Sequence, residues 1–228
     1  MRTNGLLIAV DGPAGVGKST ICKIVAESLG YSFINTGEMY RALAWKVLSD
    51  GVNPLDEAAV GSMPKKLSWD FRRTDGAAIK TYLCGELMDN RIFSEEVSRT
   101  SSQIAKYHEV RDFMKAEQRR LGRDGGILME GRDIGTAVFP DAELKIYLDA
   151  APEARATRRF EQLKGKGMPA DYDEILRGII SRDKNDAGRL IAPLMKAQDC
   201  VYIDTTDKTI AQVTDGILTL AKEKCSLI

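Results

Sequence analysis

A glycine-rich turn near the start of the chain constrains the fold more than any other stretch. The apolar residues 6–10 run into "DGPAGVGKST", in which Gly12, Gly17, Lys18 and Ser19 give the spacing G-x-x-x-x-G-K-S. A short apolar run is typical of a buried strand, and the apolar residues after the turn have helical spacing. This strand–turn–helix order is the context of a phosphate-binding loop, so we predict that the turn holds a chain of phosphates.

The residue types of this loop suit phosphate for separate physical reasons. Glycines let successive backbone N–H groups point inward, and the start of the following helix adds partial positive charge. Lys18 is expected to reach the β- and γ-phosphate oxygens of ATP, and the Ser19 hydroxyl to be a ligand of Mg²⁺. The predicted ATP contacts of the loop are Gly12, Pro13, Ala14, Gly15, Val16, Gly17, Lys18, Ser19 and Thr20.

Strand and helix patterns alternate along most of the chain. Further strand candidates are 31–35, 126–130, 144–150 and 200–204, with helical patterns between them. Strands that alternate with helices predict an α/β fold with a doubly wound, five-stranded parallel sheet. At 228 residues the chain is long enough for a single domain of this kind with insertions.

One segment, roughly 63–93 and extending to about 110, breaks this alternation. Leu67, Trp69 and Phe71 alternate with polar residues, and Asp75-Gly76 is a hairpin turn signal. We therefore predict a small inserted subdomain that contains an antiparallel hairpin.

A second segment, roughly 155–190, is highly charged and has a loose centre in "KGKGMPAD". Asp171 and Glu174 form a variant of the capping box, which predicts a helix that restarts near Tyr172. We expect this segment to be a helical lid.

Charge and cysteine content exclude several classes of protein. Lys plus Arg and Asp plus Glu are both 33, so there is no basic excess for nucleic acid or a membrane surface. The 4 cysteines lie far apart, which favours reduced thiols in a cytoplasmic protein. No apolar stretch approaches the ~18 residues of a membrane span. We expect a monomer with small-molecule partners, and no nucleic-acid or membrane partner.

The loop alone leaves the reaction open. A GTP switch needs an N-K-x-D stretch to read guanine, which this sequence lacks, and a large motor needs more chain. A small kinase is the class that size favours. A kinase of shikimate or a sugar acid, and a nucleotide-binding protein without activity, remain alternatives.

The acceptor of such a kinase is expected beyond the carboxyl ends of the strands, where open parallel sheets bind ligands. Thr36 and Arg41 follow the second strand, and Arg132 and Asp133 follow the third. Both pairs of residues are therefore predicted to lie at the same edge of the sheet.

Four stretches together resemble the bacterial cytidylate kinases: "GPAGVGKST", "NTGEMYRA", "EGRDIGTAVFPDA" and "RDKNDAGRLIAPL". They occur in order along nearly the whole chain. The resemblance implies an enzyme of pyrimidine nucleotide metabolism that transfers the γ-phosphate of ATP to CMP or dCMP with Mg²⁺. It also implies that the inserted subdomain binds the nucleoside monophosphate.

The resemblance implies a role for each matching residue. The CMP phosphate would be held by Arg41, Arg132 and Arg189. Cytosine would be read by Ser102, Arg111 and Asp133. The sugar would meet Thr36, Arg182 and Asp186. On the ATP side the candidates are Arg158, Arg159 and the loop 204–208. The implied catalytic set is Lys18, Arg132, Arg158 and Arg189.

The chemistry fits these roles. Arginine presents a planar fork of donors that matches a phosphate. A carboxylate at Asp133 accepts from the cytosine amino group, whereas the uracil oxygen at that position would be rejected. The attacking phosphate oxygen is already ionised, so positioning and charge neutralisation suffice without a catalytic base.

Each assignment has a plainer alternative. Asn35 with Glu38 could cap the second helix, and Arg158 with Arg159 could form a solvated helix face. Arg111 could pair with Glu117 or another surface acid. The residues Arg182 and Asp186 could form an ordinary i, i+4 pair.

Three positions depart from the pattern of the family. Asn35 and Glu130 stand where the family has Asp, and Phe93 stands where it commonly has Arg. The longer side chain of Glu130 puts in doubt any role in positioning Mg²⁺.

Overall fold

The computed structural model describes residues 2–73, 76–165 and 167–226. Five strands form one sheet: β1 (Leu7–Asp11), β2 (Ser32–Asn35), β6 (Ile127–Glu130), β7 (Leu144–Asp149) and β8 (Val201–Asp204). Their order across the sheet is β2-β6-β1-β7-β8, and every neighbouring pair is parallel. The predicted α/β fold with a five-stranded parallel sheet is confirmed, because each strand lies within a residue of its expected ends.

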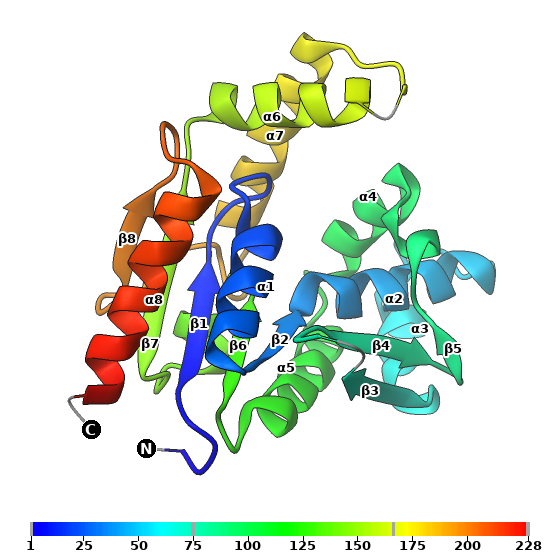
Figure 1. Ribbon diagram of the computed structural model, residues 1–228. Helices are drawn as coiled ribbons and strands as arrows, with labels where there is room; N and C mark the ends of the chain where they lie inside the picture. The colour runs from blue at the N-terminus through cyan, green and yellow to red at the C-terminus, as the bar shows by residue number, and fades with distance from the viewer. Residues whose placement is uncertain (1, 74–75, 166, 227–228) are drawn as a thin grey trace.

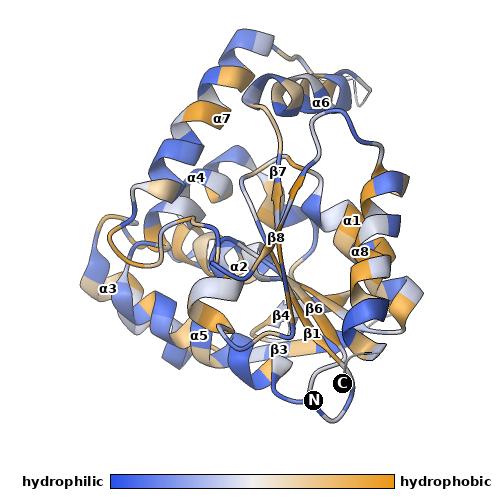
Figure 2. Cartoon of the chain, turned by 90° about the vertical axis from the view of Figure 1, so that its left-hand side faces the viewer, coloured by the Kyte–Doolittle hydropathy of each residue, from blue (hydrophilic) through white to orange (hydrophobic). Residues whose placement is uncertain are grey.

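The sheet is buried on both faces. The helices that flank it are α1 (Lys18–Leu29), α2 (Thr36–Ser49), α5 (His108–Gly122) and α8 (Ile210–Ser226). Ile8 and Val10 pack in a core with the apolar sides of α1 and α8. Leu7 and Ala9 point to the other face and pack with Phe139 and its neighbours. Figure 2 shows the apolar strands between these layers, which explains why β1 reads as a continuous apolar run.

A second, antiparallel sheet lies beyond β2. Its strands are β3 (Trp69–Arg73), β4 (Ile79–Leu83) and β5 (Glu86–Leu87), in the order β3-β4-β5. It shares a separate apolar core with α2, α5 and two further helices, α3 (Glu57–Ser62) and α4 (Glu95–Ile104). A single bridge between Phe33 and Ala78 joins it to β2. The predicted hairpin is confirmed, whereas Asp75 of its turn signal lies outside the described residues (Figure 1).

Helices α6 (Pro152–Gly165) and α7 (Tyr172–Ala187) pack on each other beyond the carboxyl ends of the strands (Figure 1). The Asp171 carboxylate accepts the backbone N–H of Glu174 at 2.7 Å, so the predicted helix start is confirmed. The use of this helical pair as a lid, and the limits of the inserted subdomain, remain predictions. Of the helices in the described ranges, none is both long enough and apolar enough to cross a membrane.

The burial of β6 makes a prediction about stability. Leu128 in this strand is fully buried, whereas Leu190 after α7 is fully exposed. Leu128→Ala removes the same atoms as Leu190→Ala but leaves a cavity in the core. We expect Leu128→Ala to lower the free energy of unfolding by about 2–5 kcal/mol, and Leu190→Ala to change it by less than about 0.5 kcal/mol. Urea unfolding measures both, and equal losses would contradict the assigned core.

Candidate functional site

A cavity of about 610 Å³ lies at the carboxyl ends of β1, β2 and β6. It is lined by most of the predicted site residues: Ala14, Gly15, Gly17, Lys18, Ser19, Thr20, Thr36, Arg41, Ser102, Arg111, Arg132, Asp133, Arg158 and Arg189. Of the other predicted residues, Arg159 also lines the cavity, and those outside the lining are Gly12, Pro13, Val16, Arg182 and Asp186. Residues from positions 14 to 189 therefore meet in one space, which agrees with the predicted edge of the sheet.

The glycine-rich turn between β1 and α1 has a backbone that only glycine allows at its first position. Gly12 has a φ of 146°, and a Cβ atom added there would lie 2.0 Å from the carbonyl oxygen of Leu148. The Lys18 Nζ donates to the carbonyl oxygens of Gly12 and Pro13, at 2.8 and 2.7 Å. Burial and the positive charge of Arg132 together lower the pKa of Lys18 to about 7, and the negative charge of Glu130 opposes the shift.

Ser19 and Glu130 form a polar pair beside this turn. The Ser19 hydroxyl donates to Glu130 Oε1 at 2.5 Å, so the longer side chain of Glu130 does reach it. Glu130 Oε2 is buried and has no hydrogen-bond partner in the described part of the chain. Burial raises the pKa of this carboxyl, and Lys18 opposes the shift.

The donor set of this pair fits Mg²⁺, which takes a hydroxyl and one or two carboxylate oxygens. The described residues contain no group of three His, Cys, Asp or Glu side chains that could hold a metal ion. A cation beside Ser19 would therefore need phosphate oxygens and water as its other ligands, as is usual for Mg²⁺ in kinases.

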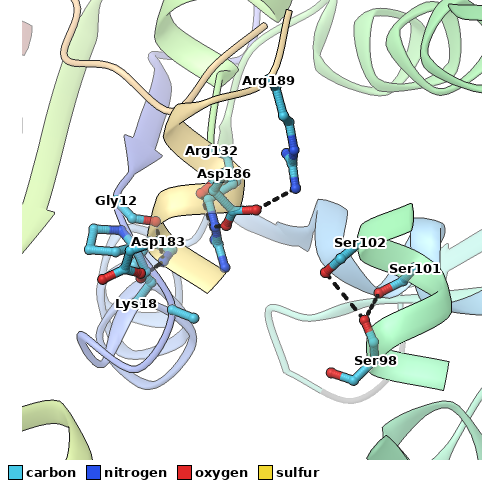
Figure 3. Close-up of polar contacts among 12 residues, drawn as sticks. Gly12, Lys18, Ser98, Ser101, Ser102, Arg132, Asp183, Asp186 and Arg189 are labelled. Carbon is cyan, nitrogen blue, oxygen red and sulfur yellow. Dashed lines mark hydrogen bonds and ion pairs between the residues drawn. The ribbon is translucent and has the colours of Figure 1, made fainter. Parts of the chain in front are cut away.

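Arginines from distant segments converge on Asp186, which is 1% exposed. Its Oδ2 accepts from Arg132 Nε at 3.0 Å, and its Oδ1 accepts from Arg189 Nη2 (Figure 3). Burial lowers the pKa of Arg182 to about 10, with a further contribution from Arg132. Arg182 Nε lacks a partner among the described residues, and no ion pair joins Arg182 to Asp186 there. The alternative of a simple i, i+4 pair is therefore wrong.

Arg41 lies on α2, on the side of the cavity that faces α4. It donates to the carbonyl oxygen of Ile92 at 3.2 Å and to Ser98 Oγ at 2.9 Å. The Ser102 hydroxyl donates to the Ser98 carbonyl oxygen at 3.3 Å, so both predicted residues are fixed by the same turn of α4. Figure 3 shows these serines across the cavity from Asp186. The aromatic ring of Phe93, which replaces the arginine of the family, lies 5.7 Å from the Arg41 guanidinium.

Arg111 and Asp133 form a buried ion pair at the inner end of the cavity. Arg111 also donates to the carbonyl oxygen of Ala105 at 3.3 Å. Burial raises the pKa of Asp133, and the Arg111 charge opposes the shift. The alternative partner Glu117 binds Arg120 instead, at 2.9 Å, so that alternative is wrong.

Arg158 joins α6 to the segment after β8. Its guanidinium donates to the carbonyl oxygens of Thr205 and Thr206, at 2.5 and 3.1 Å. This segment is part of the loop 204–208 that sequence analysis placed on the ATP side. A solvated helix face is therefore wrong for Arg158, whereas Arg159 is exposed and donates to Gln162 at 2.7 Å.

Sequence analysis did not predict two residues of the site, Arg155 and Asp183. Arg155 is 2% exposed and donates to the carbonyl oxygens of Ala14 and Ala150, at 3.1 and 3.0 Å. Its guanidinium also pairs with Asp183 of α7 at 2.6 Å. It therefore links α6 and α7 to the glycine-rich turn. Charged residues dominate α6, so no apolar stripe marked its inner face.

The second helix begins differently from the expected cap. Asn35 stands at the N-cap position, but its side chain accepts no backbone N–H. It donates instead to Glu38 Oε1 at 3.4 Å, so the capping role predicted for Asn35 is wrong. Thr36 Oγ1 donates to the Glu130 carbonyl oxygen at 2.8 Å, which ties the start of α2 to the end of β6.

Comparison with known proteins gives a consistent result. A family model described as cytidylate kinase matches residues 8–223. A cytidylate kinase of Fervidobacterium nodosum is 42% identical over 220 residues, 96% of this chain and 98% of that protein. One of Bacillus licheniformis is 44% identical over 96% of this chain and 97% of that protein. A crystal structure of a gluconokinase from Sinorhizobium meliloti covers 100% of this chain and 97% of its own, with a TM-score of 0.49 at 14% identity.

The pairing of Asp186 makes a prediction about stability. Asp186→Asn removes the negative charge that Arg132 and Arg189 share. Two poorly hydrated guanidinium groups then have no carboxylate to pair with. We expect the free energy of unfolding to fall by about 3 kcal/mol. Asp173→Asn, at an exposed site on the same helix, is the control and should change it by less than about 0.5 kcal/mol. Chemical denaturation measures both, and an unchanged value for Asp186→Asn would show that the arginines need no such partner.

Proposed function

The chain belongs to the cytidylate kinase family, and from this premise we propose that its cavity holds ATP and CMP or dCMP facing each other. The protein is an ATP-dependent phosphotransferase, and the products of the reaction are ADP and CDP or dCDP. The observation that carries the residue assignments is the meeting of Arg41, Arg132 and Arg189 with the glycine-rich turn in one cavity. That arrangement suits two phosphate groups held close together.

On the ATP side, the turn binds the phosphate chain with its backbone N–H groups and with the start of α1. The Lys18 ammonium lies against the same turn, where it can pair with the β- and γ-phosphate oxygens. Ser19 and Glu130 are the residues that would hold Mg²⁺, which neutralises phosphate charge when it is bound. Arg158 orients the loop 204–208, and we assign this loop to the adenine side.

On the acceptor side, Arg41, Arg132 and Arg189 bind the CMP phosphate. Their guanidinium groups offer paired donors and lie in a partly desolvated space, where charge pairing is stronger than in water. The attacking phosphate oxygen carries its own negative charge, so the site needs no base to remove a proton. The contribution of the protein is to hold the attacking oxygen in line with the γ-phosphate and to neutralise charge.

Asp133 provides the selection of cytosine. Its Oδ2 is taken by Arg111, and its second carboxylate oxygen is suited to accept the N4 amino group. Ser102 and Arg111 complete the base site. We assign Thr36, Arg182 and Asp186 to the sugar, with Asp186 also ordering the phosphate-binding arginines. A monomer in the cytoplasm remains our prediction for the working form.

The assay for this proposal measures ADP release with CMP, dCMP, UMP, AMP and shikimate as acceptors. We expect the largest kcat/KM with CMP or dCMP. The Lys18→Ala variant is the blank, because loss of the charge at the transferred phosphate should lower turnover by about 100-fold or more. Lys23→Ala, an exposed lysine on the same helix, should retain activity. Equal or greater turnover of shikimate or AMP would favour another kinase, and ATP binding without turnover would favour a binding protein.

The assignment of Asp133 predicts a loss of discrimination. Asp133→Asn keeps the shape of the side chain but offers an amide donor, which the uracil oxygen accepts and the cytosine amino group does not. We expect the ratio of kcat/KM for CMP to that for UMP to fall by about 10- to 100-fold. Asp112→Asn, an exposed change on α5 beside Arg111, is the control and should leave the ratio unchanged. An unchanged ratio of kcat/KM for CMP to that for UMP in Asp133→Asn would contradict a role of Asp133 in recognising the base.

A further inference from the structure

Asp11 is a buried carboxylate with no role in the proposed chemistry. It is the last residue of β1, directly before Gly12 of the glycine-rich turn, and it is 5% exposed. Burial raises its pKa to about 6, although two backbone hydrogen bonds lower it. Burial of this carboxylate therefore costs desolvation free energy, which an apolar residue at the same position would not cost.

Both oxygens of Asp11 are used by one short segment. Oδ1 accepts the backbone N–H of Ile134, and Oδ2 accepts that of Gly135, each at 2.8 Å. These are the first two residues of η3 (Ile134–Val138), a single π-helical turn. The first N–H groups of a helix have no partner within the helix, so Asp11 supplies it. Single π-helical turns are frequent at functional sites.

The residue that immediately precedes this turn is Asp133. Its carbonyl oxygen accepts the N–H groups of Ala137 and Val138, at 2.8 and 3.2 Å. Its φ and ψ of −146° and 25° lie outside the usual helix and strand regions. Arg111 fixes its side chain, and Asp11 fixes the backbone on its carboxyl side. The position of the Asp133 carboxylate therefore depends on two buried charges from different elements.

We infer that Asp11 is a positioning residue for acceptor selection, because it fixes the backbone that aims Asp133 at the base. This inference rests on the proposed reading of cytosine by Asp133. Asp11 itself does not touch either substrate. It acts through the N–H groups of Ile134 and Gly135, and its effect belongs to the acceptor rather than to ATP.

The glycine-rich turn has its own supports, so a change at Asp11 should affect it less. Gly12 packs against the carbonyl oxygen of Leu148, and Arg155 holds the carbonyl oxygen of Ala14. Lys18 bridges the carbonyl oxygens of Gly12 and Pro13. None of these contacts passes through the Asp11 side chain, although Asp11 is adjacent in sequence.

Asp11→Asn tests the inference. The amide can accept one backbone N–H, but its own NH₂ group then faces the other N–H, so η3 must shift. We expect the ratio of kcat/KM for CMP to that for UMP to fall by about 10-fold, while the KM for ATP changes by less than about 3-fold. Amide hydrogen exchange at Ile134 or Gly135 should become faster. The control is Asp149→Asn at the end of the adjacent strand β7, whose carboxylate accepts the N–H of Ala150 at 2.9 Å; it should leave the ratio unchanged.

The outcomes separate this inference from the proposal on which it rests. If the wild-type protein does not prefer CMP to UMP, the reading of cytosine fails. If it does and folded Asp11→Asn keeps that preference, only the role of Asp11 is overturned. Equal losses for ATP and CMP would make Asp11 a merely structural residue. If Asp11→Asn does not fold, Asp11→Glu keeps the charge but moves it by one methylene, and the same fall in the ratio is expected.

Discussion

Repulsion among poorly hydrated guanidinium groups is the constraint on which this site depends. Arg41, Arg132, Arg182 and Arg189 come from three parts of the chain. Burial lowers the pKa of both Arg41 and Arg182, and the charge of Arg132 lowers both further. Asp186 bridges two of the four and so lets the fold tolerate them together. In the proposed complex, the phosphate of the acceptor would bring the negative charge that this cluster still lacks. Its binding would then relieve part of the repulsion among the guanidinium groups.

The parallel sheet is what brings these charges to one place. Strands that run in the same direction deliver their carboxyl ends to one edge, where the loops that follow carry the polar residues. Helices α6 and α7 lie beyond this edge (Figure 1) and are not independent of it. Arg155 binds both Asp183 of α7 and the carbonyl oxygen of Ala14. Movement of the helical pair must therefore strain or break a contact with the glycine-rich turn.

Local signals in the sequence were sufficient for the strands, the hairpin and the glycine-rich turn, whereas cavity residues such as Ser102, Arg111 and Arg189 were implied only by the resemblance to the family. Apolar runs mark buried strands, and the spacing Gly12 to Ser19 marks the phosphate loop. Arg155 and Asp11 had no such signal. Each is a charged residue that is buried because a distant segment folds over it. Ala14, which accepts from Arg155, and Ile134, which donates to Asp11, each lie more than a hundred residues from their partner. The wrong cap at Asn35 has a different, local cause, because the Asn35 side chain donates to Glu38 instead of accepting a backbone N–H.

Two carboxylates at neighbouring strand ends link the glycine-rich turn to the segment that carries Asp133. Strand β1 leads into the glycine-rich turn, yet its last residue, Asp11, binds the turn η3 that follows Asp133. Strand β6 leads toward η3, yet its last residue, Glu130, binds Ser19 of the glycine-rich turn. The two strands pair directly, with Val10 opposite Glu130. Each half of the site is therefore anchored on the strand that serves the other half. In-line transfer depends on the separation of the two phosphates, and in the proposed complex this crossed arrangement would make that separation depend on one strand pair.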